Sequence, residues 1–132
     1  MPGVDRFGFT KLLVVDLEAS ATFYKTVFGL EERGRVRSEI ADRKIDEIMF
    51  EPQTPGGASF VLLHFDGVTA PSSDEVILGF VTTDLSGLVA RVERTGGTVV
   101  APARKQPEHG VLVAFVNDNE GHLIEVVEML AP

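Results

Sequence analysis

Along this chain, a continuous apolar run is followed by apolar residues at helical spacing, and this order occurs twice. An apolar run over Phe9–Val15 is followed by Asp16, by a stretch with helical spacing and by Gly29. A second run over Glu75–Thr82 leads in the same way into Asp84, a helical stretch and a glycine pair. An apolar run that gives way to helical spacing predicts a strand that leads into a helix. The sequence therefore predicts two copies of one strand–helix unit.

Local signals predict where each helix begins and which face it buries. Asp16 and Asp84 are predicted N-caps, because a short carboxylate accepts hydrogen bonds from the free N–H groups of a first helical turn. One face of each helix is apolar, formed by Leu17, Ala21, Tyr24 and Phe28 in the first copy and by Leu85, Leu88, Val89 and Val92 in the second. We expect these faces, including the single tyrosine, to lie in the core.

Three further strand-like segments are expected after each helix. They are Glu31–Glu39, Lys44–Glu51 and Ser59–Phe65 in the first copy, and Thr98–Ala101, Val111–Val116 and His122–Met129 in the second. Residues 102–110 are predicted to form a polar loop that is locally basic through Arg104, Lys105 and His109. The predicted order is βαβββ twice, which is an α+β fold. We expect one domain over residues 1–132, with modules at about 7–66 and 75–130 and a linker at 67–74.

Composition and charge restrict the classes of partner. The chain has 132 residues and a net charge of −8, which disfavours nucleic acid and anionic membrane surfaces as partners. It has no cysteine, which excludes a disulfide framework, a thiolate nucleophile and a cysteine-based zinc site. No apolar run has the length of a membrane span, and the N-terminus carries Asp5 and Arg6 instead of a signal-peptide run, so we expect a cytoplasmic protein.

Three segments carry a resemblance to a known family. They are VVDLEASATFYKTVFGLEE at Val14–Glu32, DLSGLVARVERTGGTVV at Asp84–Val100 and DNEGHLIEVVE at Asp118–Glu128. With the βαβββ repeat, they resemble the vicinal oxygen chelate superfamily, which includes glyoxalase I, extradiol dioxygenases, methylmalonyl-CoA epimerase, and bleomycin- and fosfomycin-resistance proteins. The resemblance covers nearly the whole chain and implies a curved eight-stranded mixed sheet. It says little about the reaction, because the superfamily supports many chemistries.

The resemblance also implies where a metal would be bound. Enzymes of the superfamily usually take one ligand each from the first, fourth, fifth and eighth strands, and these positions correspond here to Phe9, Leu62, Ile77 and Glu125. Only Glu125 has a donor atom, since the other three side chains have no lone pair to offer a metal. We therefore expect no metal and no other cofactor, and an apolar cleft in the place of the metal site. A divalent metal at a shifted site is the alternative.

Glu125 and His64 are the candidate catalytic residues. Strand alternation places Glu125 on one face with Leu123, and the same rule places His64 on one face with Leu62. If both faces line one cleft, Glu125 is a candidate general base or anchor for a polar ligand atom, and His64 an acid or base near neutral pH. The alternatives are a glutamate that is paired with an arginine or exposed at the sheet margin, and a histidine that is hydrogen-bonded locally. His109 and His122 are expected to face solvent.

Arg33, Arg35 and Arg37 recur at the period of a strand, so they are expected on one face. Cross-strand pairs with Asp46 and Glu47 explain this stripe better than a site for an anionic substrate does.

Three kinds of function fit these observations. The first is a metal-free small-molecule protein that binds through the apolar residues Phe9, Leu62, Ile77 and Leu123, either as a resistance-type binder or as a proton-transfer enzyme. The second is a metal-dependent glyoxalase-like lyase, isomerase or dioxygenase with shifted ligands. The third is an interaction or regulatory module with a filled cleft. A homodimer is expected in each case, because two βαβββ modules leave sheet edges and apolar faces uncovered.

Overall fold

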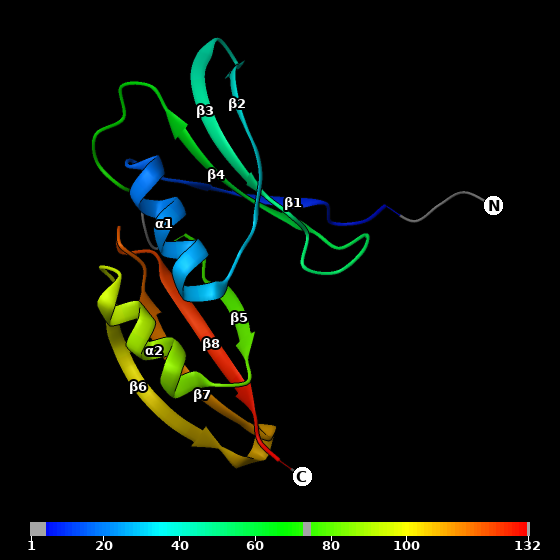
Figure 1. Ribbon diagram of the computed structural model, residues 1–132, viewed down its shortest axis with the longest axis vertical. Helices are drawn as coiled ribbons and strands as arrows, with labels where there is room; N and C mark the ends of the chain where they lie inside the picture. The colour runs from blue at the N-terminus through cyan, green and yellow to red at the C-terminus, as the bar shows by residue number, and fades with distance from the viewer. Residues whose placement is uncertain (1–4, 73–74, 132) are drawn as a thin grey trace, which may run out of the picture.

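The two repeats of the sequence form two βαβββ units in a computed structural model that describes residues 5–72 and 75–131 (Figure 1). The first unit consists of β1 (Phe9–Leu13), α1 (Leu17–Phe28), β2 (Glu32–Ile40), β3 (Arg43–Phe50) and β4 (Ser59–Phe65). The second consists of β5 (Leu78–Thr82), α2 (Leu85–Arg94), β6 (Thr98–Gln106), the short 3₁₀ helix η1 (Pro107–His109), β7 (Val111–Asn117) and β8 (Leu123–Met129). The α+β class and the repeated order are as the sequence predicts.

Each unit folds its strands into a four-stranded mixed sheet with the same topology. The strand orders are β1-β4-β3-β2 and β5-β8-β7-β6, and the first strand of each unit pairs in parallel with the last. The eight strands, expected as a curved eight-stranded mixed sheet of two modules, are hydrogen-bonded as two four-stranded sheets, one in each module. In each sheet the first strand, β1 or β5, lies at an edge, with no further strand paired beyond it among the described residues.

Both helices begin at the predicted caps. The side chain of Asp16 accepts a hydrogen bond from the backbone N–H of Ala19 at 3.0 Å, and Asp84 accepts one from Gly87 at 3.0 Å. Gly29 ends α1 with φ of 69°, a left-handed conformation that glycine adopts without strain. These contacts fix the point at which each strand turns into its helix.

The two units meet through their helices, which cover the same side of the molecule (Figure 1). Phe23, Tyr24 and Val92 are almost fully buried between the helices and the sheets, in one core that both units share. The rings of Phe28 and Phe80 stack across the junction with centroids 3.8 Å apart. The predicted burial of Tyr24 is confirmed.

Strand boundaries differ from the prediction mainly in the second unit. β6 continues to Gln106, so most of the predicted loop at 102–110 is strand, and only η1 and Gly110 form the turn. Irregular pairing with β7 allows the strand to pass Pro102, which has no N–H to donate. β5 begins at Leu78, three positions later than predicted. The predicted linker includes residues 73–74, which lie outside the described residues.

Candidate functional site

Each sheet has one face against the helices and one face turned away from them, here called the open face. Ile124 and Val126 of β8 belong to the shared core, so the residues that alternate with them lie on the open face. By the same argument Leu12 of β1 faces the core, and Phe9, Lys11 and Leu13 lie on the open face of the first sheet.

Glu125 lies on the open face of the second sheet with Leu123. In the strand register it is opposite Gly79 of β5 and Phe115 of β7, and its side chain is half-buried. Because Gly79 has no side chain, the carboxylate is bordered by an apolar ring on one side and by bare backbone on the other. No ion pair among the described residues involves Glu125.

Phe9 and Ile77 are exposed apolar residues at the free edges of the two sheets. Phe9 is 57% exposed and Ile77 is 58% exposed. Both lie at edge strands, Phe9 at the start of β1 and Ile77 directly before β5. They are accessible to a ligand or to another chain, as the prediction that they bind a ligand requires.

Leu62 does not lie on the face where the sequence analysis expected it. It is fully buried in the core beneath the helices, and it pairs with Leu12, which also faces the core. The open-face residue of β4 is its neighbour Val61, which pairs with Lys11. A difference of one position in a strand moves a side chain to the opposite face of the sheet.

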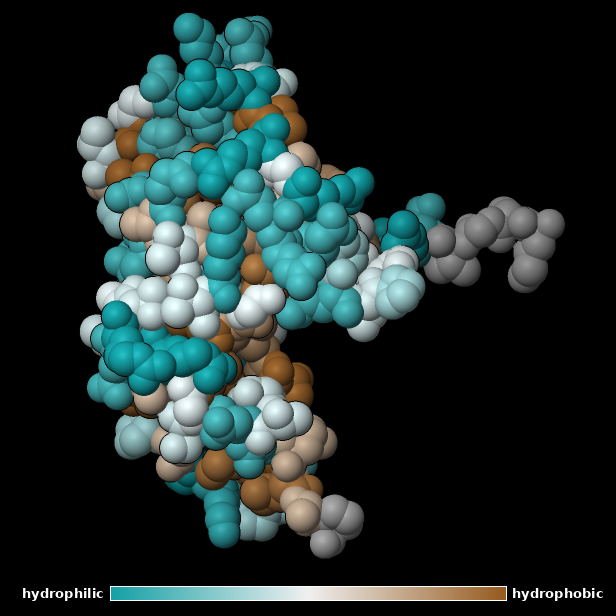
Figure 2. All heavy atoms as spheres, in the orientation of Figure 1, coloured by the Kyte–Doolittle hydropathy of each residue, from teal (hydrophilic) through white to brown (hydrophobic). Residues whose placement is uncertain are grey.

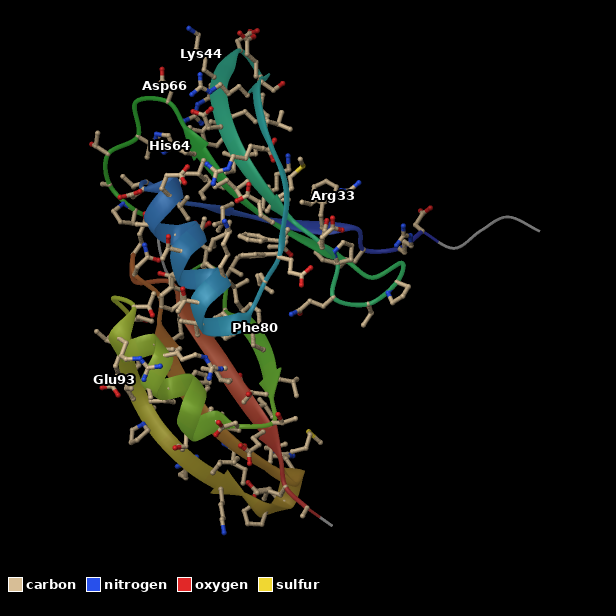
Figure 3. All side chains as sticks on the ribbon, in the orientation of Figure 1. Arg33, Lys44, His64, Asp66, Phe80 and Glu93 are labelled. Atoms are coloured by element: carbon tan, nitrogen blue, oxygen red, sulfur yellow. The ribbon has the colours of Figure 1, made fainter. Side chains whose placement is uncertain are left out.

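His64 is likewise separated from Glu125. Its Nδ1 lies 3.0 Å from the carbonyl oxygen of Val14, so this ring nitrogen donates and holds the ring beside the start of α1. Figure 3 shows His64 in the first unit near one end of α1. His64 lies two residues after the buried Leu62, so it is on the helix side of the first sheet. Glu125 is on the open face of the second sheet. The local hydrogen bond that was the alternative is the one that the structure contains.

The metal implied by the resemblance does not fit the side chains at these positions. Phe9, Val61 and Ile77 share the open faces with Glu125 but offer no donor atom. In residues 5–72 and 75–131 no three His, Cys, Asp or Glu side chains are grouped so that they could hold a metal ion. A single carboxylate does not make a metal site.

Lys11 and Glu47 form an ion pair on the open face of the first sheet that sequence reasoning missed. The Lys11 Nζ is 3.0 Å from a Glu47 carboxylate oxygen, and Glu47 is only 8% exposed. The neighbours of the pair in the sheet include the buried Val61 and Leu63. The sequence feature that could have indicated this pair is Lys11 itself, the single charged residue within an apolar strand.

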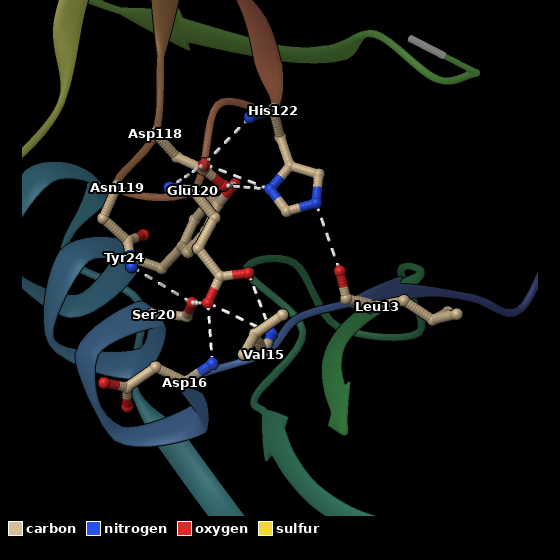
Figure 4. Close-up of polar contacts among 9 residues, drawn as sticks. All are labelled: Leu13, Val15, Asp16, Ser20, Tyr24, Asp118, Asn119, Glu120 and His122. Atoms are coloured by element: carbon tan, nitrogen blue, oxygen red, sulfur yellow. Dashed lines mark hydrogen bonds and ion pairs between the residues drawn. The ribbon is translucent and has the colours of Figure 1, made fainter. Parts of the chain in front are cut away.

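A buried network around Asp118 is the second feature that the sequence analysis missed (Figure 4). Asp118 accepts hydrogen bonds from the Tyr24 hydroxyl at 2.8 Å and from His122 Nδ1 at 2.8 Å, and His122 Nε2 lies 3.1 Å from the carbonyl oxygen of Leu13. His122 is 6% exposed, so the prediction that it faces solvent was wrong. The exposure predicted for His109 is confirmed.

The network shifts the proton affinity of all three side chains. Burial raises the pKa of Tyr24 well above its usual value, and the Asp118 carboxylate adds to this effect. Burial acts to raise the pKa of Asp118, but the hydrogen bonds from His122 and Tyr24 outweigh it and lower that pKa. The hydrogen bond to Asp118 raises the pKa of His122 against the opposing effect of burial. Because both ring nitrogens of His122 face oxygen acceptors, the geometry favours the doubly protonated ring.

Glu120 joins the same turn to the start of α1. Its carboxylate accepts hydrogen bonds from the backbone N–H groups of Val15 and Asp16 at 2.8 and 2.7 Å, and the Ser20 hydroxyl lies 3.3 Å away. A carboxylate at a helix N-terminus is favoured by the helix dipole. The β7–β8 turn of the second unit is therefore bonded to the first unit at several points, a structural role for its acidic residues.

Ion pairs also account for two arginines of the stripe on β2. Arg37 pairs with Asp46 across the strands at 3.0 Å, as predicted. The predicted partner Glu47 pairs with Lys11 instead, and no ion pair among the described residues involves Arg33. Arg35 contacts Glu18 and Glu32, and the hydrogen bonds from Arg35 and then from Lys25 lower the pKa of Glu32 to about 2. These contacts support the structural interpretation of the stripe over an anion site.

Comparison with known proteins places this arrangement in a family. The profile of the Glyoxalase/Bleomycin resistance protein/Dioxygenase superfamily matches residues 6–126. A search of curated proteins finds no match. In the described residues, no helix combines the length and apolar character that a membrane crossing needs.

Solved structures with the same fold support the family match. A glyoxalase family protein from Bacillus cereus superposes with a TM-score of 0.83 at 18% identity, over 98% of this chain and 97% of that one. A glyoxalase-related enzyme from Fulvimarina pelagi is 26% identical, with a TM-score of 0.64 over 95% and 88% of the two chains. A glyoxalase I mutant from Zea mays is 22% identical with a TM-score of 0.74, and the match spans 92% of this chain but 45% of that one. From the family profile and the shared fold, this chain belongs to the Glyoxalase/Bleomycin resistance protein/Dioxygenase superfamily.

Proposed function

We propose that this protein is a metal-free small-molecule binder whose ligand rests on the open face of the second sheet and is anchored by Glu125. The observation that carries the proposal is a half-buried carboxylate among apolar neighbours, with no acidic or imidazole group beside it that completes a metal site. Ligand sites are mostly apolar with a few polar groups that fix orientation. A hydrophobic ligand that carries a cationic or hydrogen-bond-donating group matches this surface.

The residues around Glu125 define how such a ligand is held. Leu123 and Phe115 supply apolar contact on the β7–β8 side. Gly79 leaves the β5 side open, and beyond it Ile77 and Val81 present exposed apolar surface. The ligand's polar group then meets the carboxylate at the centre of the sheet, while its apolar part lies against Phe115 and Leu123.

A second copy of this chain is the partner that we propose for the exposed part of these faces. Phe9, Ile77 and Val81 are 57%, 58% and 74% exposed, and all three lie at the edge strands. Apolar side chains gathered at two free sheet edges are typical of an interface. We expect light scattering at micromolar concentration to give the mass of a homodimer; a monomer there contradicts this part of the proposal.

An enzymatic alternative uses the same carboxylate. Glu125 is placed to take a proton from a ligand that rests on the open face, without His64, which donates to the Val14 carbonyl on the other side of its own sheet. Binding without chemistry needs only the observed apolar surface and one anchor, and we therefore favour it. A metal-dependent lyase or dioxygenase is not supported, because Phe9, Val61 and Ile77 have no donor atom and the described residues contain no group of three His, Cys, Asp or Glu side chains that could hold a metal ion.

The test compares two probes of the same shape that differ in charge. We expect 2-naphthylmethylamine to bind more tightly than 2-naphthylmethanol at pH 7. We expect Glu125→Gln to lower the affinity for the amine about tenfold and to leave the affinity for the alcohol unchanged. The reason is that a hydrogen bond to a charged group contributes about 1.5–3 kcal/mol. Glu108→Gln, an exposed carboxylate in η1, is the matched control. Equal losses in both variants, or no preference for the amine, refute the proposal.

Chelation provides an independent check. We expect dialysis against EDTA to leave the thermal unfolding midpoint and the affinity for the amine unchanged, since the open-face positions hold no donor set. A lower midpoint that recovers when a divalent metal is returned shows that a metal binds this fold.

A further inference from the structure

Two hollows adjoin along β5 at the junction of the two units, and they reach the edge of the open face at Gly79, whereas Glu125 lines neither of them. Their volumes are about 500 and 380 Å³, and Gln53, Gly79 and Phe80 line both. The outline of the molecule narrows between the two units, and hydrophobic residues are visible there (Figure 2). Because the hollows share three residues, they form one elongated groove, here called the β5 groove.

Aromatic rings form the floor of the β5 groove. Phe80 is half-buried and its ring stacks on Phe28 at 3.8 Å with an interplanar angle of 13°. Figure 3 shows Phe80 at the junction of the units, below the C-terminal end of α1. Phe60 lines the other half of the groove, and the buried Tyr24 holds its ring at a centroid distance of 5.0 Å. Rings that are fixed in this way offer flat apolar surface at little cost in conformational entropy.

One end of the groove carries a cationic side chain without an acidic partner. Arg91 lines this end, and its Nε donates a hydrogen bond to the carbonyl oxygen of Val27 at 3.1 Å. None of the ion pairs formed by residues 5–72 and 75–131 includes Arg91. Its terminal N–H groups therefore keep the fork that binds a carboxylate in a bidentate manner. In a chain with a net charge of −8, this makes the end of the groove locally suited to an anion.

The other end of the groove is polar and carries hydroxyl groups together with the exposed carboxylate of Glu51. Thr10 and Ser59, which lie on neighbouring strands, line it together with Thr54 of the β3–β4 loop. Such hydroxyl groups accept or donate hydrogen bonds according to the ligand. The groove thus runs from a cation past flat aromatic surface to hydroxyl groups and the Glu51 carboxylate, so an anionic group of a ligand is favoured at the Arg91 end.

We propose that the β5 groove is a second binding site, for planar aromatic compounds that carry a carboxylate. The aromatic part lies over Phe80 and Phe60, and the carboxylate bonds to the Arg91 guanidinium. The volume is that of sites for small organic ligands, which span about 300–1,000 Å³. This site goes beyond the proposed function, because it selects anionic ligands at the junction of the units, whereas Glu125 selects cationic ones on the open face.

The experiment uses the full chain in its solution assembly, with 2-naphthoate and its neutral analogue 2-naphthamide as probes. We expect naphthoate to shift the backbone amide NMR signals of Gly79, Phe80 and Gln53. We expect Arg91→Gln to lower the affinity for naphthoate at least tenfold and to change the affinity for naphthamide little. Arg94→Gln, an exposed change of the same charge in the same helical turn, is the control and leaves both affinities unchanged.

Two further measurements make the result decisive. The affinity of the unmodified protein for naphthoate falls with added salt, whereas that for naphthamide does not, and this readout does not depend on whether Arg91→Gln folds. Glu125→Gln leaves naphthoate binding intact, which separates this site from the open face. Signal shifts confined to Phe9 and Glu125, equal losses in both arginine variants, or no binding at millimolar probe overturn the proposal.

Discussion

At the scale of single residues, close packing decides which substitutions the shared core accepts. Gly97 follows α2 and lies against both units: a Cβ placed there would be 2.5 Å from the Asn117 carbonyl oxygen, 2.7 Å from a Val92 methyl carbon and 2.9 Å from the Phe23 ring. Its neighbour Gly96 has φ of 90° but more open space, with Asn119 at 3.7 Å. The two glycines are therefore required for different reasons, one for space and the other for its backbone conformation.

We expect Gly97→Ala to lower the free energy of unfolding by about 1–3 kcal/mol or more, because an added methyl group must displace backbone and ring atoms. Urea unfolding followed by circular dichroism measures the change. Gly96→Ala is the comparison, and its cost of about 1 kcal/mol comes from backbone strain in an open position. A smaller loss for Gly97→Ala than for Gly96→Ala contradicts the packing argument.

Single residues also show what the sequence can and cannot indicate. Glu125 could be placed on the open face because strand alternation groups it with Leu123 and the family resemblance assigns its position to the cleft. Leu62 could not, because Phe60, Val61, Leu62 and Leu63 are all apolar and nothing in the run distinguishes its two faces.

At the scale of secondary-structure elements, two carboxylates of the second unit bond to the starts of the two helices. Glu120, before β8, bonds to the N-terminus of α1, and Glu128, within β8, accepts a hydrogen bond from the Leu85 N–H at the start of α2 at 2.7 Å. The caps Asp16 and Asp84 were predictable because each side chain bonds to a backbone N–H only three positions later. The long-range pairs were not, since partners 43 to 105 positions apart leave no local pattern.

We expect Glu120→Gln to lower the free energy of unfolding by about 1–3 kcal/mol, because one of the two oxygens becomes an NH₂ group that faces a backbone N–H of Val15 or Asp16. Equilibrium urea unfolding measures the loss. Glu108→Gln, in the exposed turn of η1, is the control and is expected to change the free energy by no more than about 0.5 kcal/mol. If Glu120→Gln is as mild as the control, its bonds to α1 contribute little.

At the scale of the whole molecule, a charged contact joins the two units. His122 belongs to the second unit, and its ring lies between Asp118 of the same turn and the Leu13 carbonyl of the first unit (Figure 4). The fold class and the repeat were readable from the sequence because they rest on local periodicity. This junction was not, since a histidine after a Gly turn looks like a surface residue until Tyr24 and Leu13 are placed beside it.

The junction predicts how stability depends on pH. The pKa of His122 is raised above its ordinary value of 6.5, so the folded state binds this proton more tightly than the unfolded chain does. The stability from His122 is complete below pH 6.5 and is lost as pH rises through the raised pKa. Asp118 acts in the opposite direction: its lowered pKa contributes stability above its ordinary value of 3.8, and this is lost as pH falls through the lowered pKa.

We therefore expect the free energy of unfolding to fall by on the order of 1–3 kcal/mol from pH 6 to the alkaline side of the raised His122 pKa, and to fall again in acid. Urea unfolding over this range measures the slope. His122→Gln is expected to be less stable at pH 6 and to lose the slope above pH 6.5, because the glutamine amide does not titrate. His109→Gln, an exposed histidine in η1, keeps the slope of the unmodified protein. A slope that survives in His122→Gln means that another group titrates on unfolding and that His122 is not the charged link between the two units.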